Sequence, residues 1–277
     1  MITVRHKETG ETLLDWPGDT LAGAGLPNAV LLYADLQGAT LAGADLRGAD
    51  LCQADLRGAV LDGANLAGAD ITLANLAGAS FRGAILADAR LQAVTLDLAG
   101  PARTDFRGAE LTRVNLKNSN LSSSIFVDAE MRRIDLTHVD LTGSDLSGAN
   151  LTEANFSYST LRGADLSFSM LVSALFNAVD LTGASLRHAD LTFAVLNAAE
   201  LAEADVSSAL LSQTVFARSP SLARARGLDT LEFLTASSID LDTLRYAADL
   251  PDELLARMGI DRERLAALRS VSPGASR

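Results

Sequence analysis

The sequence is poor in residues that cross-link a chain or span a membrane. Cys52 is the only cysteine among 277 residues, so no internal disulfide can form and a reducing compartment is expected. The N-terminal segment, residues 1–8, lacks the apolar stretch of a signal peptide. No apolar run approaches the roughly 18 residues that a transmembrane helix needs. We therefore expect a soluble cytoplasmic protein, bacterial by default, with no membrane association.

The sequence also lacks the residue groupings that carry catalysis or bind metals. Its three histidines, His6, His138 and His188, are scattered, and no Cys-x-x-Cys or His-Glu-x-x-His spacing occurs. The serines at 122–124 have no evident base. The glycines recur too regularly to form a phosphate-binding loop. The sequence therefore predicts a protein that is not an enzyme, with no catalytic, cofactor-binding or metal-binding residues and no cofactor.

What the sequence does contain is a repeat of five residues. Taking every fifth residue from Leu21 to Phe216 gives 40 positions, of which 39 are apolar and one is Pro101. Two residues before these central positions, alanine stands in 27 of the 40 repeats, and the residue between is often Asp or Asn. Of the 21 glycines, 14 follow a central position by two residues. Such regularity predicts a repeat architecture.

A five-residue period restricts the backbone to one kind of path. In a helix, five residues overshoot a full turn by about 140°, and in a strand an odd step points the side chain to the opposite face. Every fifth residue can be buried only if the chain turns a corner once per repeat, where Gly and Asx tolerate the required dihedral angles. The chain must therefore coil around an axis, with its leucines and alanines inside.

The segment Ala44-Asp45-Leu46-Arg47-Gly48 shows the repeat in its plainest form and resembles the pentapeptide-repeat family. The resemblance covers residues 21–218 and implies an all-β solenoid, a right-handed four-sided β-helix of about ten coils with 20 residues in each. On this geometry Phe106 stacks on Phe126, and Phe156 stacks on Phe176. Cys52, which follows a central leucine, points outward.

The two ends are expected to cap this rod. Residues 1–20 predict a β-hairpin, with strands at 2–7 and 12–16 and Trp16 covering the first coil. Residues 219–277 predict a small α-helical tail. Its first helix contains Leu228, Leu231 and Leu234, its second is capped by Asp240, its third opens at Pro251 and ends at Gly259, and its fourth is capped by Asp261.

The repeat is irregular at residues 94–104, where Leu98, Gly100 and Pro101 replace the usual residues. Proline cannot donate to a β-ladder, so this segment predicts a bulge or kink, or alternatively a protrusion that binds a partner.

An apolar stripe on the outside of the rod is a candidate interface. The position before the central residue, usually Asp or Asn, is apolar at Met170, Leu175, Val195, Leu210 and Val215. An exposed apolar stripe needs cover. We expect either that the tail folds back over it or that it forms the seam of a homodimer.

The charge is a second candidate feature. The net charge is −12, and residues 1–220 carry 26 acidic and 15 basic side chains. This charge excludes direct binding of nucleic acid. A 20-residue coil aligns Asp145, Asp165 and Asp205 into an acidic face interrupted by Ser185. Against this acidic face, the same spacing places the basic residues Arg47, Arg107 and Arg187 in one column.

Two functions agree with these features. The first is a non-catalytic scaffold that presents a rigid rod to an unidentified protein partner. The second is implied by the resemblance, because some members of the family mimic DNA, bind type II topoisomerases such as gyrase and confer quinolone resistance. A pull-down from the native host would identify the partner, and a supercoiling assay would separate the two functions.

Overall fold

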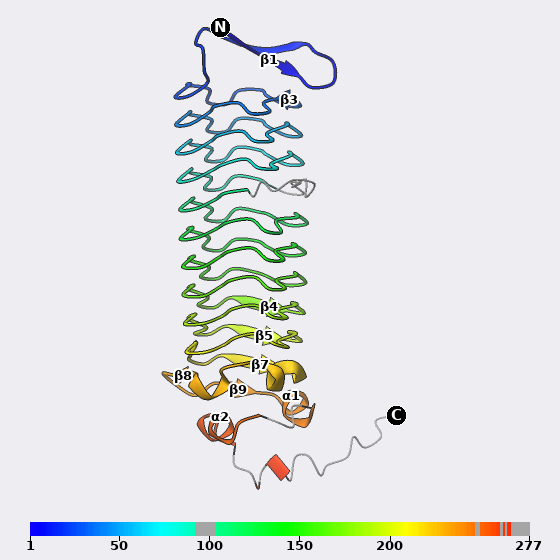
Figure 1. Ribbon diagram of the computed structural model, residues 1–277, viewed down its shortest axis with the longest axis vertical. Coiled ribbons are helices and arrows are strands. Elements are labelled where there is room, and N and C mark those ends of the chain that lie inside the picture. The colour runs from blue at the N-terminus through cyan, green and yellow to red at the C-terminus, as the bar shows by residue number, and fades with distance from the viewer. Residues whose placement is uncertain (92–103, 247–249, 261–262, 264, 267–277) are drawn as a thin grey trace.

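The computed structural model describes residues 1–91, 104–246, 250–260, 263 and 265–266. Residues 21–91 and 104–217 form a straight stack of coils, with residues 1–16 at one end of the stack and residues 220–246 at the other (Figure 1). Each outward residue before a central position bridges, in parallel, the residue 20 positions later, as Asp45 does to Asn65. Four such bridges occur in each 20-residue coil, so the rod has four walls.

We number the walls in chain order. Their outward columns run from Gly25 through Glu130 to Leu210 (wall 1), from Val30 through Asp135 to Val215 (wall 2), from Asp35 through Asp140 to Glu200 (wall 3), and from Thr40 through Asp145 to Asp205 (wall 4).

The corners are tight turns of one kind in most repeats. In the first coil the Ala24 amide donates to the Leu21 carbonyl at 3.0 Å, and Gly23 between them has a φ of 66°. A hydrogen-bonded turn with positive φ at its third residue is a type II β-turn, which explains the preference for glycine there. Leu73 and Phe193 occupy the same corner position with a φ of 60° each, so the fold imposes this conformation on other residues too.

The core is a continuous apolar column. Central leucines such as Leu46 and Leu146 and the small residues before them, such as Ala44, are fully buried. The phenylalanines stack as expected: the ring centroids of Phe106 and Phe126 lie 4.9 Å apart and those of Phe156 and Phe176 5.0 Å apart. The expected ladder of stacked rings is therefore present in the core.

Regular strands are few and short in the described rod, because most wall residues pair as single bridges. The strands of the coils are β3 (Ala34–Asp35), β4 (Leu175–Asn177), β5 (Val195–Asn197), β6 (Leu210–Leu211) and β7 (Val215–Ala217). β4, β5 and β7 lie in register in one parallel sheet on wall 2.

One coil is longer than the others by a single repeat. Ser80 bridges Asp105, and Ile85 bridges Glu110, a step of 25 residues instead of 20. The step also stacks Phe81 on Phe106 at 5.0 Å. The prediction that Arg47 shares a column with Arg107 and Arg187 is therefore wrong, because the extra repeat moves Arg47 to wall 1 and leaves the other two on wall 4.

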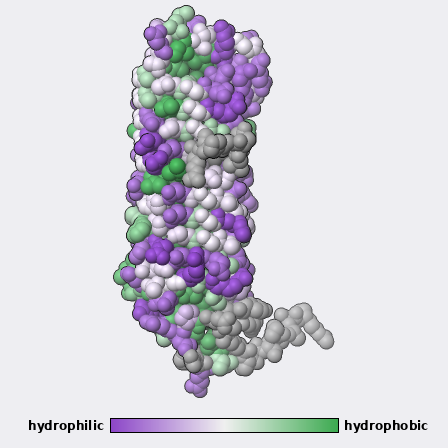
Figure 2. Space-filling view, in the orientation of Figure 1, coloured by the Kyte–Doolittle hydropathy of each residue, from purple (hydrophilic) through white to green (hydrophobic). Residues whose placement is uncertain are grey.

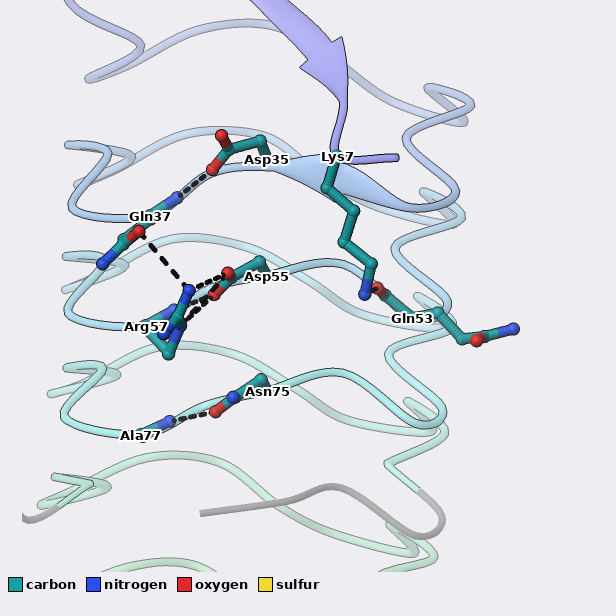
Figure 3. A network of polar contacts seen from close by, with 8 residues as sticks. All are labelled: Lys7, Asp35, Gln37, Gln53, Asp55, Arg57, Asn75 and Ala77. Carbon is teal, nitrogen blue, oxygen red and sulfur yellow. Dashed lines mark hydrogen bonds and ion pairs between the residues drawn. The ribbon is translucent and has the colours of Figure 1, made fainter. Parts of the chain in front are cut away.

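The N-terminal end is covered by a hairpin. β1 (Ile2–His6) pairs antiparallel with β2 (Thr12–Trp16) and, on its other edge, with β3 of the first complete coil. Val4 is buried, and Trp16 is partly buried against the core. Figure 3 shows Lys7 reaching from the end of this hairpin to the second coil, where its Nζ donates to the Gln53 carbonyl.

The C-terminal segment extends the coil before it becomes helical. It contains the 3-10 helices η1 (Pro220–Arg224) and η2 (Leu228–Thr230), the strands β8 (Glu232–Phe233) and β9 (Ser238–Ile239), and the helices α1 (Leu241–Tyr246) and α2 (Asp252–Arg257). β8 pairs with β6, and β9 pairs with β7. Buried leucines of this segment, among them Leu222, Leu244 and Leu254, cover the lower end of the core.

The prediction of a first tail helix through Leu228, Leu231 and Leu234 is wrong. The spacing suits a helix, but the open backbone edge of the last coil accepts hydrogen bonds from the Glu232 and Leu234 amides, and the segment therefore pairs as β8. The expected cap of the second helix is present, since Asp240 Oδ1 accepts from the Thr243 amide at 2.8 Å. Gly259 has a φ of 73° just after α2. The fourth helix falls mostly outside the described residues.

Within the described residues, no helix combines the length and apolar character needed to cross a membrane.

Candidate functional site

The outward Asp and Asn residues hold the backbone of their own repeat. Asp35 Oδ1 accepts from the Gln37 amide at 3.3 Å, Asp55 Oδ1 from the Arg57 amide at 3.2 Å, and Asn75 Oδ1 from the Ala77 amide at 3.1 Å. Figure 3 shows these three contacts one above another on wall 3. Such side-chain-to-backbone bonds close a local Asx turn. The frequency of Asp and Asn in the repeat therefore has a structural cause.

Many of the wall carboxylates are also paired with arginine. Arg57 Nη2 lies 2.6 Å from Asp55 Oδ2, and its hydrogen bond lowers the pKa of Asp55 against the opposing effect of partial burial. Nine arginines of the described rod form an ion pair with an acid on their own or a neighbouring coil: Arg47, Arg57, Arg82, Arg90, Arg107, Arg113, Arg133, Arg162 and Arg187. The acidic charge of the rod is consequently divided into paired sites.

The candidate acidic face lies on wall 4. Asp145 bridges Asp165, Asp165 bridges Ser185, and Ser185 bridges Asp205, so the alignment and its interruption are as the sequence indicates. Asp205 is paired with Arg187 at 3.2 Å. Partial burial raises the pKa of Asp205, but hydrogen bonds from Ser207 and Arg187 hold it below its ordinary value. Above Asp145 the column continues with Ile125, so the acidic face is short.

The candidate apolar stripe divides between two adjacent walls. Leu175, Val195 and Val215 stack on wall 2 as β4, β5 and β7, whereas Met170 and Leu210 lie on wall 1 with Asp190 between them. Met170 is 47% exposed and Leu175 is 38% exposed. The described part of the tail follows the backbone edge at the end of the rod, where β8 pairs with β6 and β9 pairs with β7. Cover of the stripe by the rest of the tail or by a second copy of the chain stays a prediction.

Sequence reasoning missed three aromatic residues beside this stripe. Tyr158, Phe168 and Phe193 occupy corner positions with positive φ and are 61%, 65% and 48% exposed. Tyr158 stacks on His138 with ring centroids 5.1 Å apart, and Phe168 stacks on His188 at 4.8 Å. An aromatic residue where the repeat prefers glycine was the available signal.

The remaining candidates are the predicted bulge and the single cysteine. Leu98, Gly100 and Pro101 lie outside the described residues. Cys52 is half-buried, and this burial raises the pKa of its thiol. In the part of the chain that the structure describes, His, Cys, Asp and Glu form no group of three or more that could hold a metal ion. On the face that Figure 2 shows, hydrophilic and hydrophobic residues are mixed along the rod.

A stack of five-residue repeats around an apolar core, with four bridged walls, defines a β-solenoid. The profile of the family described as pentapeptide repeats matches in eight copies, and the matched residues include 21–97, 102–167 and 174–213. These matches take up more than half of the sequence. The chain belongs to the pentapeptide-repeat family.

Solved structures of the same family resemble the chain. HetL, a pentapeptide-repeat protein involved in regulating heterocyst differentiation in the cyanobacterium Nostoc sp. strain PCC 7120, is 28% identical, with 78% of this chain and 90% of HetL covered and a TM-score of 0.67. A trypsin-treated form of QnrB1, a plasmid-mediated fluoroquinolone resistance protein, is 19% identical, with 75% and 97% covered and a TM-score of 0.58. The second likeness shows the fold alone. No curated protein matches the chain.

Proposed function

We propose that the protein is a non-catalytic rod whose walls bind another protein. The observation that carries this proposal is that the backbone repeats while the outward residues change. On wall 2 the same bridge position holds Asp70, Arg90, Asn155 and Leu175 in turn. A backbone fixed by its own hydrogen bonds loses little conformational entropy on binding, so varied side chains displayed on it suit recognition.

The likeness to HetL supports a role in regulation, because HetL is a pentapeptide-repeat protein involved in regulating heterocyst differentiation. The likeness does not imply that this chain and HetL bind the same partner. Identifying the partner of this chain is therefore the way to identify the process in which it acts.

Capture from the native host tests the proposal. Four variants are compared with the wild-type protein, each with the apolar or charged outward residues of one wall replaced by Asn, which the repeat itself uses at these positions. A partner that is lost with one wall variant and kept with the other three would support binding through a wall. Capture that is equal for all five proteins would contradict it.

A second candidate is a DNA mimic that binds a type II topoisomerase. The net charge of −12 and the aligned Asp145, Asp165 and Asp205 favour it. The nine arginine pairs of the rod weigh against it, since a chain of phosphates has no such alternation of charge. The rigid scaffold is therefore the function that the geometry supports better.

A DNA-supercoiling assay with gyrase separates the two candidates. Purified protein is added with and without a quinolone at micromolar concentration. Inhibition of supercoiling, or protection of gyrase from the drug, would favour the DNA mimic. Unchanged supercoiling under both conditions would contradict the DNA mimic and favour the scaffold function.

A further inference from the structure

The lower part of wall 2 differs from every other part of the rod at the same height. From Asn155 down to Ala217 its outward residues carry no charge: they are Asn155, Ser157, Leu175, Asn177, Val195, Asn197, Val215 and Ala217, which we call the uncharged strip. At the same height wall 1 carries Asp190, wall 3 carries Asp180 and Glu200, and wall 4 carries Asp165 and Asp205. In a chain of net charge −12, such a gap is a specific feature of this wall.

The polar groups of the uncharged strip are used internally. Asn177 Nδ2 donates to Ser157 Oγ at 3.0 Å, and Asn197 Nδ2 donates to Asn177 Oδ1 at 3.2 Å. Arg218 Nε closes the ladder from below by donating to Asn197 Oδ1 at 3.1 Å. A side-chain amide that is already hydrogen-bonded loses less when a partner displaces water from it. The ladder therefore lowers the desolvation penalty for covering the strip with an apolar surface.

Aromatic residues stand at the two corners that border the strip. Tyr158, 61% exposed, lies at the corner with wall 3, and Phe193, 48% exposed, lies at the corner with wall 1. Exposed aromatic side chains of this kind are typical anchors of protein interfaces. Between them Leu175, Val195 and Val215 form a ladder with one apolar side chain per coil.

The size of the strip restricts what it can hold. Four coils about 4.8 Å apart and a wall of five residues at about 3.3 Å each cover roughly 300 Å². A standard interface between folded proteins buries about 800 Å² on each partner. The strip is therefore too small for a stable contact with a folded domain or with a second copy of the chain.

A helix matches this footprint. About 13 helical residues span roughly 20 Å with a diameter of about 10 Å, and side chains on one helix face recur every turn of about 5.4 Å. This repeat is close to the spacing of the Leu175–Val195–Val215 ladder, so successive turns can seat against successive coils. The acids beside the strip on wall 3, Asp180 and Glu200, are paired with Arg162 and Arg224. It is therefore the net charge of −12 on the whole chain that favours a partner with basic flanks.

The geometry points to the uncharged strip as a docking surface for an amphipathic α-helix of another protein, apolar toward the strip and basic along its flanks. This inference rests on the proposed function and deepens it, because it names the wall and the class of partner. Recognition of an amphipathic helix by its regularly spaced apolar residues is an established mode of peptide binding.

The repeat itself supplies matched variants for the test. The strip variant carries Leu175→Asn and Val195→Asn, and the control variant carries Val60→Asn and Ile125→Asn on wall 4, at the same position of the repeat. Asn is native at this position in Asn115 and Asn155, so both variants are expected to fold. Circular dichroism and thermal unfolding confirm that each rod is intact.

The probe is a fluorescein-labelled Leu/Lys peptide about 14 residues long, with leucines on one helix face, and its scrambled permutation is the control peptide. At an ionic strength of about 0.15 M, fluorescence anisotropy is expected to show about tenfold tighter binding of the amphipathic peptide to the wild-type protein, an advantage that the control variant keeps and the strip variant loses. Equal binding of the two peptides, or equal loss in both variants, would overturn the inference.

Sedimentation of the same three proteins tests the other occupant. If the wild-type protein and the control variant are dimers and the strip variant is a monomer, the strip holds a second copy of the chain. This result would overturn the inference that the strip binds a helix of another protein. The proposed function can fail separately from this inference. A native partner captured through another wall would support the proposed function and contradict docking on the uncharged strip. Equal capture by the wild-type protein and all wall variants would contradict both the proposed function and the inference.

Discussion

At the scale of single residues, the small inward position before each central residue holds a buried hydroxyl in several described repeats, and most of these hydroxyls have a hydrogen-bond partner. Ser144 Oγ donates to the Leu141 carbonyl at 2.7 Å. Ser124, one coil above it, is fully buried, and its Oγ is the one buried side-chain polar atom of the described residues without a hydrogen-bond partner. Burying such a group without a partner costs about 1–3 kcal/mol.

We therefore expect Ser124→Ala to stabilise the rod by about 1 kcal/mol, because it removes an unpaired hydroxyl and supplies the residue most common at this position. Urea unfolding measures the change. Ser144→Ala is the matched control and is expected to leave the stability unchanged or lower it. A stabilisation of equal size in both variants would show that the missing hydrogen bond is not the cause.

The corners give a second prediction at this scale. Gly63 has a φ of 64°, and a Cβ added there meets no heavy atom within 4 Å, so Gly63→Ala would introduce backbone strain and no clash. Left-handed backbone costs a non-glycine residue about 1–2 kcal/mol. We expect a destabilisation of about 1 kcal/mol, seen as a lower midpoint of thermal unfolding.

The converse substitution checks the same cause. Leu73 is 51% exposed at an equivalent corner with a φ of 60°, so Leu73→Gly removes strain and little packing. Its midpoint should rise or stay level. A fall as large as that of Gly63→Ala would mean that the corner side chain, and not the dihedral angle, sets the stability.

At the scale of elements, the five-residue period predicts the core, the corners and the walls, because every repeat has the same order of inward apolar, outward polar and turn-forming residues. The period could not reveal the extra repeat, since a step of 25 residues keeps every fifth residue inside and changes only which coils align. Nor could it reveal β8, because the spacing of Leu228, Leu231 and Leu234 suits a helix until the open edge of β6 is present. Long-range hydrogen bonds decided both cases.

The same reasoning applies to the candidate surfaces. The apolar residues of the stripe were visible in the sequence, and a count of 20 per coil already separates Leu175, Val195 and Val215 from the column of Met170, Asp190 and Leu210. What the count cannot give is the exposure of each side chain. The corner aromatics were missed because a residue in the glycine position is read as a turn and not as a surface. Exposure of Tyr158 and Phe193 became evident only from the fold.

Asp240 joins the rod to the first helix of the tail, and its effect should depend on pH. Its Oδ1 accepts from the Thr243 amide at 2.8 Å and from the Arg218 amide at 3.0 Å. Partial burial raises the pKa of Asp240, but the hydrogen bonds from Thr243 and Arg218 together have the larger effect and bring the pKa below its ordinary value. A carboxyl with a lowered pKa stabilises the fold above its ordinary pKa, and this contribution disappears as the pH falls through the lowered pKa.

Asp240→Ala is therefore expected to destabilise α1 by about 1 kcal/mol at neutral pH, through the lost cap, with a smaller difference from the wild-type protein near pH 3. Amide hydrogen exchange of α1, compared between the two proteins at the same pH, measures it. Glu232→Ala on β8 controls for the loss of one negative charge. A difference between wild type and Asp240→Ala that is as large in acid as at neutral pH would contradict the role of the charged carboxylate.

At the scale of the whole molecule, the rod is a one-dimensional object in which each coil contacts only the coils above and below it. Its stability is then close to a sum of coil and nearest-neighbour terms, and a whole repeat can be added or removed wherever the bridges on both sides are restored. The extra repeat within the 25-residue step is the natural place for such a change.

Deleting residues 97–101 removes one repeat, including Pro101, and joins Leu96 directly to Ala102. The joined sequence, Val94-Thr95-Leu96-Ala102-Arg103-Thr104, again has an apolar central residue followed by the normal spacing to Phe106. Ser80 and Asp105, which already bridge, would then be separated by the ordinary 20 residues.

We expect the shortened protein to fold with an unchanged or higher unfolding midpoint and to keep the stacking of Phe81 on Phe106. A control deletion of four residues, 97–100, shifts the register and should destabilise the rod. If both deletions destabilise it equally, the longer coil is required for the fold and its extra repeat is not a separable insertion.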